Sequence, residues 1–85
     1  MKIKILYFAS LREALQTSEE TLELPPSVTQ VGQLRELLIN RGPSWAEALA
    51  ADRAVRVALN QAVAEPDTAL PAGAEIAFFP PVTGG

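Results

Sequence analysis

Hydrophobic residues recur at every second position near the start of the chain. Within Lys2–Ala9, the residues Ile3, Ile5 and Tyr7 fall on one side of an extended backbone. This period of two is typical of a β-strand with one buried face. Three later segments with the same alternation are also predicted strands: Glu20–Leu24, Val55–Leu59 and Glu75–Phe79. The connection over Ala62–Gly73 contains two prolines and is predicted to be irregular, with at most a short strand.

A helical period lies between the second and third predicted strands. Val31, Leu34 and Leu38 share one face of an amphipathic helix. The predicted helices, each with its N-cap, are Leu11–Gln16 after Ser10, a main helix from Thr29 to about Arg41, and a short one from Ser44 to about Ala51. Gly42 is expected to adopt the left-handed conformation that follows a helix, and Pro43 prevents the helix from continuing.

The predicted elements follow the order strand, strand, helix, short helix, strand, strand. One amphipathic helix across one face of a small mixed sheet is the simplest way to bury this pattern, with the first strand paired with the last. The pattern therefore predicts an α+β fold of the β-grasp type. We expect one domain over residues 1–79 and an extended, flexible C-terminal tail over residues 80–85.

Both faces of the predicted sheet carry hydrophobic residues, although a two-layer fold buries only one face. The residues expected to face the helix are Ile3, Ile5, Val57, Leu59, Ile76 and Phe78. Those expected to face away are Leu6, Phe8, Ala58, Ala77 and Phe79. Two interpretations fit this second face: the Ala62–Pro71 loop covers it, or it binds a partner protein.

The composition limits what the chain can do by itself. Among its 85 residues there is no cysteine and no histidine, which removes the commonest nucleophile, general base and metal ligands. We therefore expect neither a self-sufficient hydrolase nor a metalloenzyme. The net charge of −3 argues against nucleic-acid binding, and no hydrophobic run is long enough to cross a membrane. The start of the chain shows no signal-peptide pattern, and the acidic charge suits the cytoplasm and a partner with a basic surface.

The chain ends in Pro80-Pro81-Val82-Thr83-Gly84-Gly85. The two prolines favour an extended stalk, and two glycines without side chains can enter a slot too narrow for other residues. A frayed terminus or an expression scar is the alternative explanation.

A carboxylate must be activated before a nucleophile can attack it. An adenylating partner would supply that activation, because the chain has no GxGxxG or Walker motif of its own. Sulfide or a persulfide would then give a thiocarboxylate, and an amine would give an isopeptide bond.

Five other positions have less specific signals. Glu19 and Glu20 are adjacent on a strand and are interpreted as solvated charges on opposite faces. Arg12 is a surface residue and a candidate for contact with a partner. Trp45 is interpreted as helix packing, and Gly32 as the accommodation of a close contact.

Three segments together resemble the small subunit of molybdopterin synthase. They are Ile5-Leu-Tyr-Phe-Ala-Ser-Leu-Arg-Glu13, Val57-Ala-Leu-Asn-Gln61 and Phe78-Phe-Pro-Pro-Val-Thr-Gly-Gly85. The resemblance covers nearly the whole chain and implies a ubiquitin-like sulfur carrier of molybdenum-cofactor biosynthesis. One departure is Ala74, where the family usually has Asp after a turn glycine, here Gly73, so the hydrogen bonding of that turn is in question.

The resemblance also implies partners and roles for individual residues. Gly85 would be adenylated by a ubiquitin-activating-like adenylyltransferase and converted to a thiocarboxylate, with Gly84 beside it. The tail residues Pro80, Pro81, Val82 and Thr83 would enter the large synthase subunit, in a complex expected to be a heterotetramer, and sulfur would pass to cyclic pyranopterin monophosphate. The apolar contacts with that subunit would be Phe8, Val63 and Phe79. No bound cofactor and no metal are expected; AMP and the thiocarboxylate are transient covalent states.

Three other functions fit the same sequence. A thiazole-pathway or tRNA-thiolation sulfur carrier would share the Gly-Gly ending, although thiazole-pathway carriers are usually shorter and lack the two prolines. A ubiquitin-class modifier would form covalent adducts with other proteins. A simple interaction domain would show neither a thiocarboxylate nor adducts.

Overall fold

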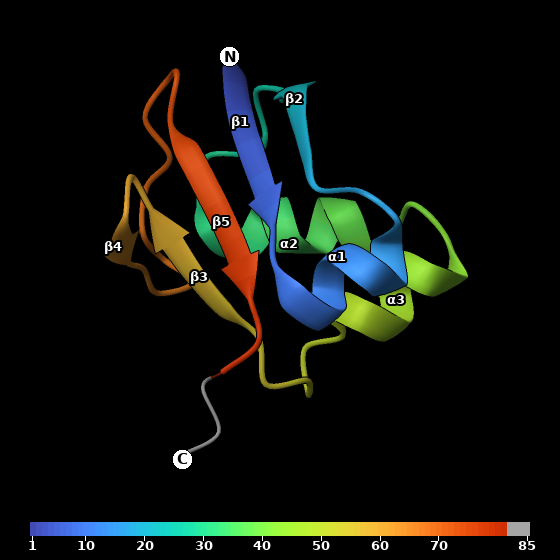
Figure 1. Cartoon of the computed structure of the whole chain (residues 1–85). Coiled ribbons are helices and arrows are strands. Elements are labelled where there is room, and N and C mark those ends of the chain that lie inside the picture. The colour runs from blue at the N-terminus through green and yellow to red at the C-terminus, as the bar shows by residue number, and fades with distance from the viewer. Residues whose placement is uncertain (82–85) are drawn as a thin grey trace.

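The computed structural model describes residues 1–81. The order of its main helices and strands along the chain matches the predicted order (Figure 1). A short helix after the first strand and a short strand before the last complete the set. The elements are β1 (Lys2–Tyr7), α1 (Ala9–Leu15), β2 (Glu19–Glu23), α2 (Val31–Ile39), α3 (Pro43–Leu49), β3 (Arg56–Leu59), β4 (Ala62–Val63) and β5 (Glu75–Phe79). The short strand expected within the proline-containing connection is β4.

The five strands form one mixed sheet in the order β2-β1-β5-β3-β4. The central pair, β1 and β5, is parallel, and the other neighbouring pairs are antiparallel. The expected pairing of the first strand with the last is confirmed. In the register of this pair, Ile5 lies opposite Ile76 and Tyr7 lies opposite Phe78. The α+β class and the mixed sheet are therefore as the alternation of the sequence predicts.

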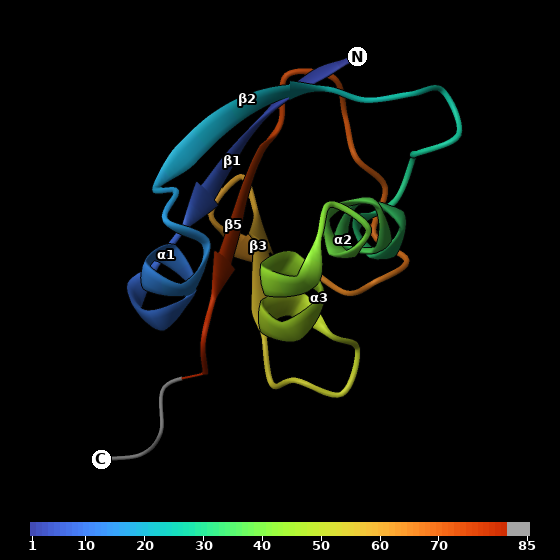
Figure 2. The same ribbon diagram turned by 90° about the vertical axis from the view of Figure 1, so that its right-hand side faces the viewer.

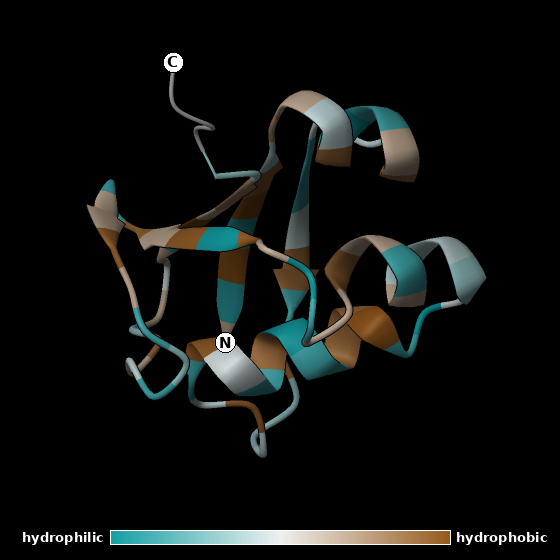
Figure 3. Ribbon diagram, turned by 90° about the horizontal axis from the view of Figure 1, so that it is seen from below, coloured by the Kyte–Doolittle hydropathy of each residue, from teal (hydrophilic) through white to brown (hydrophobic). Residues whose placement is uncertain are grey.

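The core lies between one face of the sheet and the helices α2 and α3 (Figure 2). Ile5, Ile76 and Phe78 point into it from the sheet and are completely buried. Leu34 and Leu38 of α2 meet them from the other layer and are also completely buried. Hydrophobic and hydrophilic residues alternate along the ribbon, as Figure 3 shows, because each element has one buried side. The predicted core face is confirmed, although Leu59 is only half-buried.

The predicted helix caps are wrong. Helix α1 begins at Ala9, before the proposed cap Ser10, and Phe8 occupies the N-cap position. The cap of α2 is Gln30 rather than Thr29, and the Gln33 side chain accepts hydrogen bonds from the N–H groups of both residues, at 2.8 and 3.0 Å. Gln33 thus plays the part of the N3 side chain in a capping box, which binds the N–H of the N-cap residue.

Helix α3 also begins differently, because Pro43 takes its first position and not Ser44. Gly42 has φ 156° and ψ 178°, so it is not in the left-handed helical region that we predicted. It is instead the residue before α3, in a conformation that is open to glycine and strained for residues with a side chain.

The connection between β4 and β5 packs along α2. The N–H of Gly32 donates to the carbonyl oxygen of Pro66 at 2.7 Å, and the N–H of Leu70 donates to the carbonyl of Thr29 at 2.9 Å. A Cβ atom on Gly32 would lie 3.1 Å from the Pro66 oxygen, which confirms that this glycine accommodates a close contact. Ala74 is buried, and backbone hydrogen bonds close its turn without the family's usual aspartate.

Candidate functional site

The face of the sheet opposite α2 and α3 has a continuous apolar row. Leu6 on β1 lies opposite Ala77 on β5, Ala77 lies opposite Ala58 on β3, and Ala58 lies opposite Val63 on β4. We call the apolar face the six residues Leu6, Phe8, Ala58, Val63, Ala77 and Phe79. Its two most exposed members are Phe8, with 45% of its surface accessible, and Val63, with 68%. An apolar surface of this kind is typical of a protein-binding site.

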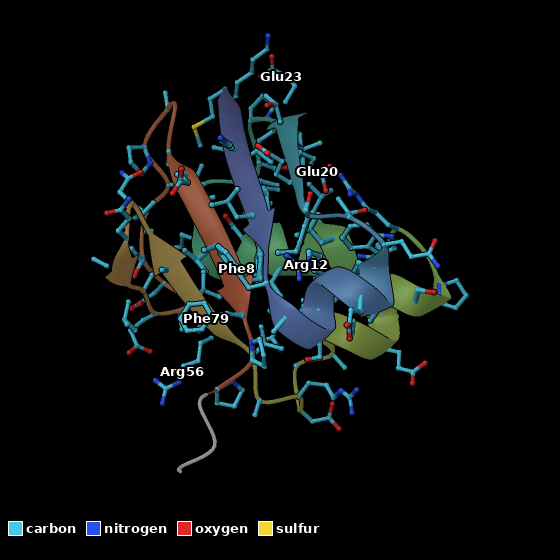
Figure 4. The ribbon with its side chains drawn as sticks, in the orientation of Figure 1. Phe8, Arg12, Glu20, Glu23, Arg56 and Phe79 are labelled. Atoms are coloured by element: carbon cyan, nitrogen blue, oxygen red, sulfur yellow. The ribbon has the colours of Figure 1, made fainter. Side chains whose placement is uncertain are left out.

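The structure decides between the two interpretations of this face. The connection after β4 runs along α2, on the other side of the sheet, where Leu70 is buried in the core and the N–H of Val31 donates to the carbonyl of Thr68. It therefore does not cover the apolar face. Phe8 and Phe79 lie on the same side of the sheet, beside the end of β5 (Figure 4). The alternative of cover by the loop is thus wrong, and the face is available for contact.

The base of the C-terminal tail adjoins this face. Strand β5 ends at Phe79, and Pro80 and Pro81 follow it, both half-buried. The predicted site residues Val82, Thr83, Gly84 and Gly85 lie outside the described residues. Arg12 is exposed on α1, and its backbone N–H contacts the carbonyl of Phe8. The structure therefore brings together Phe8, Phe79, Val63, Arg12 and the first two tail residues at one side of the molecule.

Beyond Leu6 the same face becomes charged. Lys4 on β1 forms an ion pair of 3.2 Å with Glu19 on β2. At the end of the sheet, the N-terminal amine pairs with Glu23 at 2.8 Å. Exposed ion pairs of this kind contribute little to stability. They do mark the boundary of the apolar face, which covers only β1, β5, β3 and β4. Among residues 1–81, no cluster of acidic side chains is placed to hold a metal ion.

A half-buried polar network on the core side of β2 was missed by the sequence analysis. The Tyr7 hydroxyl donates to Glu20 Oε2 at 2.8 Å, and the Arg41 guanidinium donates to both Glu20 oxygens at 2.8 Å. Arg41 also lies over the Trp45 ring, 4.6 Å from its centre, and Trp45 meets Tyr7 edge to face. Glu20 is therefore not the solvated charge that we predicted, whereas Trp45 is half-buried helix packing as expected.

Electrostatics fixes the charge state of this network. Burial alone would raise the pKa of Glu20, but the hydrogen bonds from Arg41 and Tyr7 outweigh it, so this pKa lies below its ordinary value of 4.5. Burial, together with the hydrogen bond to Glu20, raises the pKa of the Tyr7 phenol. The carboxylate is thus ionised and the phenol neutral at pH 7. No sequence signal pairs Arg41 with Glu20, because 21 residues separate them.

We expect Glu20→Gln to destabilise the fold by about 1–2 kcal/mol at pH 7, because it removes charged hydrogen bonds to Arg41 and Tyr7. A carboxyl group whose pKa is lower in the folded than in the unfolded protein stabilises the fold at pH values above its unfolded-state pKa. That stabilisation is lost as the pH falls through the folded-state pKa. The difference in the free energy of unfolding between the wild type and Glu20→Gln should therefore shrink below pH 4.5. Urea denaturation between pH 3 and 7 measures it. The control Glu19→Gln removes only an exposed pair and should change stability by less than about 0.5 kcal/mol.

Residues 5–85 match the sequence profile of the ThiS family. The chain belongs to this family. It is 40% identical to the molybdopterin synthase sulfur carrier subunit of Escherichia coli, over 98% of this chain and 99% of that one. The protein of the same name from Haemophilus influenzae is 37% identical over the same shares. The resemblance to the small subunit of molybdopterin synthase is thereby confirmed.

Solved structures with the same fold include a small archaeal modifier protein and a chain in a molybdopterin-converting factor complex. SAMP1, a small archaeal modifier protein from Haloferax volcanii, superposes with a TM-score of 0.82 at 26% identity over the full length of both chains. A complex of subunits 1 and 2 of molybdopterin-converting factor from Helicobacter pylori contains a chain that matches with a TM-score of 0.68. Its identity is 21% over the full length of both chains, which supports the fold alone. The ubiquitin-like β-grasp fold expected for this ThiS-family chain is confirmed.

No helix within residues 1–81 is long and apolar enough to cross a membrane. Within residues 1–81, the candidate site is the apolar face with Pro80 and Pro81 beside it. An exposed apolar surface of this kind suits recognition by another protein.

Proposed function

We propose that this chain is the sulfur carrier subunit of molybdopterin synthase. The observation that carries the proposal is the exposed apolar face next to the base of a Gly-Gly tail, in a chain 40% identical to a sulfur carrier of that name. The carrier would have no catalytic side chains of its own. The absence of histidine and cysteine from its sequence is consistent with this division of labour.

The proposed chemistry takes place at the carboxyl carbon of Gly85. A ubiquitin-activating-like adenylyltransferase joins the carboxylate to the α-phosphate of ATP and releases pyrophosphate. Sulfide then attacks the carbonyl carbon and displaces AMP, which leaves the thiocarboxylate directly. A persulfide donor would instead leave an acyl disulfide, and a second thiol would have to reduce its S–S bond to release the thiocarboxylate. The thiocarboxylate sulfur is the group transferred to cyclic pyranopterin monophosphate, and two such transfers give the dithiolene of molybdopterin.

The tail sets the distance over which the carrier delivers sulfur. Six residues from Pro80 to Gly85 reach about 20 Å when fully extended. The large subunit that holds the substrate must therefore contact the domain around the tail base, where the apolar face lies. The Helicobacter pylori complex of subunits 1 and 2 supports a large-subunit partner of this kind. We propose a heterotetramer of two carriers and two large subunits, in the cytoplasm.

Glutamate in place of Phe8 or Phe79 on the apolar face should weaken binding to the large subunit. Phe8→Glu and Phe79→Glu each place a charge at a contact that excludes water, and we expect about a hundredfold loss of affinity. Thermal melts should show that the domain remains folded, because Phe8 is exposed and Phe79 is half-buried. Calorimetric titration with the host's large subunit measures the affinity. Wild-type affinity in both variants would exclude the apolar face as the interface.

The mass of the intact protein from its own host tests the carrier function. A thiocarboxylate differs from a carboxylate by one sulfur in place of one oxygen, and we expect a fraction of the chain with that increase. Protein from cells without the adenylyltransferase is the control and should have only the carboxylate mass. If the increase is absent from the host protein under conditions of cofactor synthesis, the carrier function is wrong.

Protein modification is the second candidate, and the similarity to SAMP1 favours it. The same adenylate would then be attacked by a lysine amine, which forms an isopeptide bond and releases AMP. Digestion of host proteins and a search for lysines linked to the Gly84-Gly85 remnant distinguishes this outcome. Such adducts without any thiocarboxylate would support the modifier instead of the carrier.

A further inference from the structure

Six of the positively charged groups of the described chain fall into two sets, apart from Arg35, which binds backbone carbonyls, and Lys2, which lies opposite Glu23 on β2. The N-terminal amine, Lys4 and Arg41 pair with the three glutamates of β2, at the side of the sheet away from the tail. Arg12, Arg53 and Arg56 are exposed and pair with no carboxylate among residues 1–81. In a chain with a net charge of −3, these free cations are the ones that a partner can still neutralise.

Two of these arginines flank the base of the tail. Arg56 on β3 lies opposite Phe79, the last residue of β5, and Figure 4 shows it beside the point where the chain leaves the sheet. Arg53 lines a groove of about 370 Å³ that Pro80 also lines. The other walls of this groove come mainly from small residues: Ser10, Ala14, Ala48 and Ala54. One arginine thus stands on each side of the first tail residues.

The backbone that presents Arg53 is held in place by another arginine. The Arg35 side chain donates to the carbonyl oxygens of Leu49 and Ala50, at 2.7 and 2.6 Å, and to that of Arg53 at 3.2 Å. The Arg53 carbonyl also accepts from the N–H of Val55 at 2.9 Å. Burial lowers the pKa of Arg35, which is engaged with the last carbonyls of α3 and is not available to a partner. Arg53 therefore projects from a fixed loop, which reduces the entropy lost on binding.

The short tail brings the partner to this region. The five residues after Pro80 reach at most about 18 Å, so the protein that accommodates Gly85 must lie close to Pro80. A protein that contacts the apolar face at that distance also approaches Arg56, which lies opposite Phe79, and Arg53, which lines the groove beside Pro80. Glu47 shares an adjoining depression with Arg53, but the described residues show no ion pair between them. The charge around the tail base is thus left for carboxylates of the partner.

We propose that Arg53 and Arg56 form a second, basic contact surface that pairs with carboxylates of the large subunit on both sides of the tail. This inference rests on the proposed function, because it takes the large subunit as the protein that receives the tail. The apolar face supplies buried contact, and the two arginines orient the domain so that the tail points into the partner. Charges at the rim of an interface act mostly on the association rate and on its dependence on salt.

Charge reversal at these positions tests the proposal. Arg53→Glu and Arg56→Glu are each expected to weaken binding to the host's purified large subunit several-fold at low salt, and the double variant about tenfold, mostly through a slower association rate. The loss should decrease as salt is raised, because screening removes the interaction. Stopped-flow and calorimetric titrations at two salt concentrations measure both quantities.

Lys2→Glu is the matched control, because it makes the same change of charge on an exposed side chain at the opposite end of the sheet. Thermal melts of all variants should agree with the wild type, since both arginine side chains are exposed. If the arginine variants bind as the Lys2→Glu variant does, the basic surface is refuted and the proposed function stands. If the wild-type chain itself does not bind the large subunit, the proposed function is refuted together with the surface.

Discussion

Replacing Phe78 by alanine is expected to lower the free energy of unfolding by about 3–5 kcal/mol, the usual cost of truncating a buried aromatic side chain. Phe78 has no accessible surface, and its ring stacks against Tyr7 with 6.0 Å between the ring centres. The core around it contains Ile5, Ile76 and Leu34, which are also completely buried. The cavity left by the ring would therefore be lined by groups that are already closely packed, and it cannot be filled by a small shift of one neighbour.

The adjacent residue provides the control. Phe79 points to the opposite side of the sheet and is half-buried, so Phe79→Ala should cost less than about 1.5 kcal/mol in the isolated protein. Urea denaturation of the two variants and the wild type gives the comparison, with equal m-values as a check that all three unfold in the same way. Equal midpoints for the two variants would contradict the assignment of Phe78 to the core and Phe79 to the apolar face.

This pair of residues shows which part of the fold could be predicted from the sequence. The side of a strand on which a residue lies follows from its position alone, because successive side chains alternate. Both faces of β1, β3 and β5 were predicted correctly for this reason. The pairing of β1 with β5 was expected from the need to cover one face of a mixed sheet with a single main helix, whereas its parallel direction came from the structure. The faces of the strands follow from the alternation of side chains, and the pairing of the first strand with the last follows from the need to bury one face of the sheet.

The helix caps and the Glu20 network could not be predicted in this way. Ser10, Thr29 and Ser44 are all good N-cap residues, yet none of them begins a helix here. Gln33 satisfies the first N–H groups of α2, and Pro43 fixes the start of α3. Capping differences of about 1 kcal/mol are small compared with the burial of a helix face, so packing decides where each helix begins.

The candidate site was also predicted only in part. Phe8, Phe79 and Val63 followed from alternation and from the resemblance of the sequence to sulfur carriers. Arg53 had no such signal, because its position depends on hydrogen bonds from Arg35, 18 residues away in the chain. The same is true of Glu20, whose pairing with Arg41 spans 21 residues. Contacts between side chains that are distant in sequence leave no periodic trace, and only the structure reveals them.

The largest effect on function is expected at the C-terminus. Adding one alanine after Gly85 converts the reactive carboxyl group into an amide and moves the free carboxylate about 3.5 Å further out. Sulfur transfer should fall at least a hundredfold, since a misplacement of even about 1 Å can have that effect. Gly84→Val should fail as well, because a β-branched side chain is excluded from a slot shaped for bare backbone. The melting temperature should not change in either variant, since the buried core described by the structure lies within residues 3–78.

A reconstituted assay with the adenylyltransferase, a sulfur donor and the large subunit measures the transfer. The extended chain has a matched control in its own digestion product: carboxypeptidase removes the added alanine, and activity should return to that of the wild type. Recovery would show that the position of the carboxyl carbon, and not a change in the domain, causes the loss. Binding of the extended chain to the large subunit through the apolar face should persist at reduced affinity. Full sulfur transfer by the undigested, extended chain would falsify the carrier mechanism, because no carboxyl group would then be present on Gly85 to be adenylated.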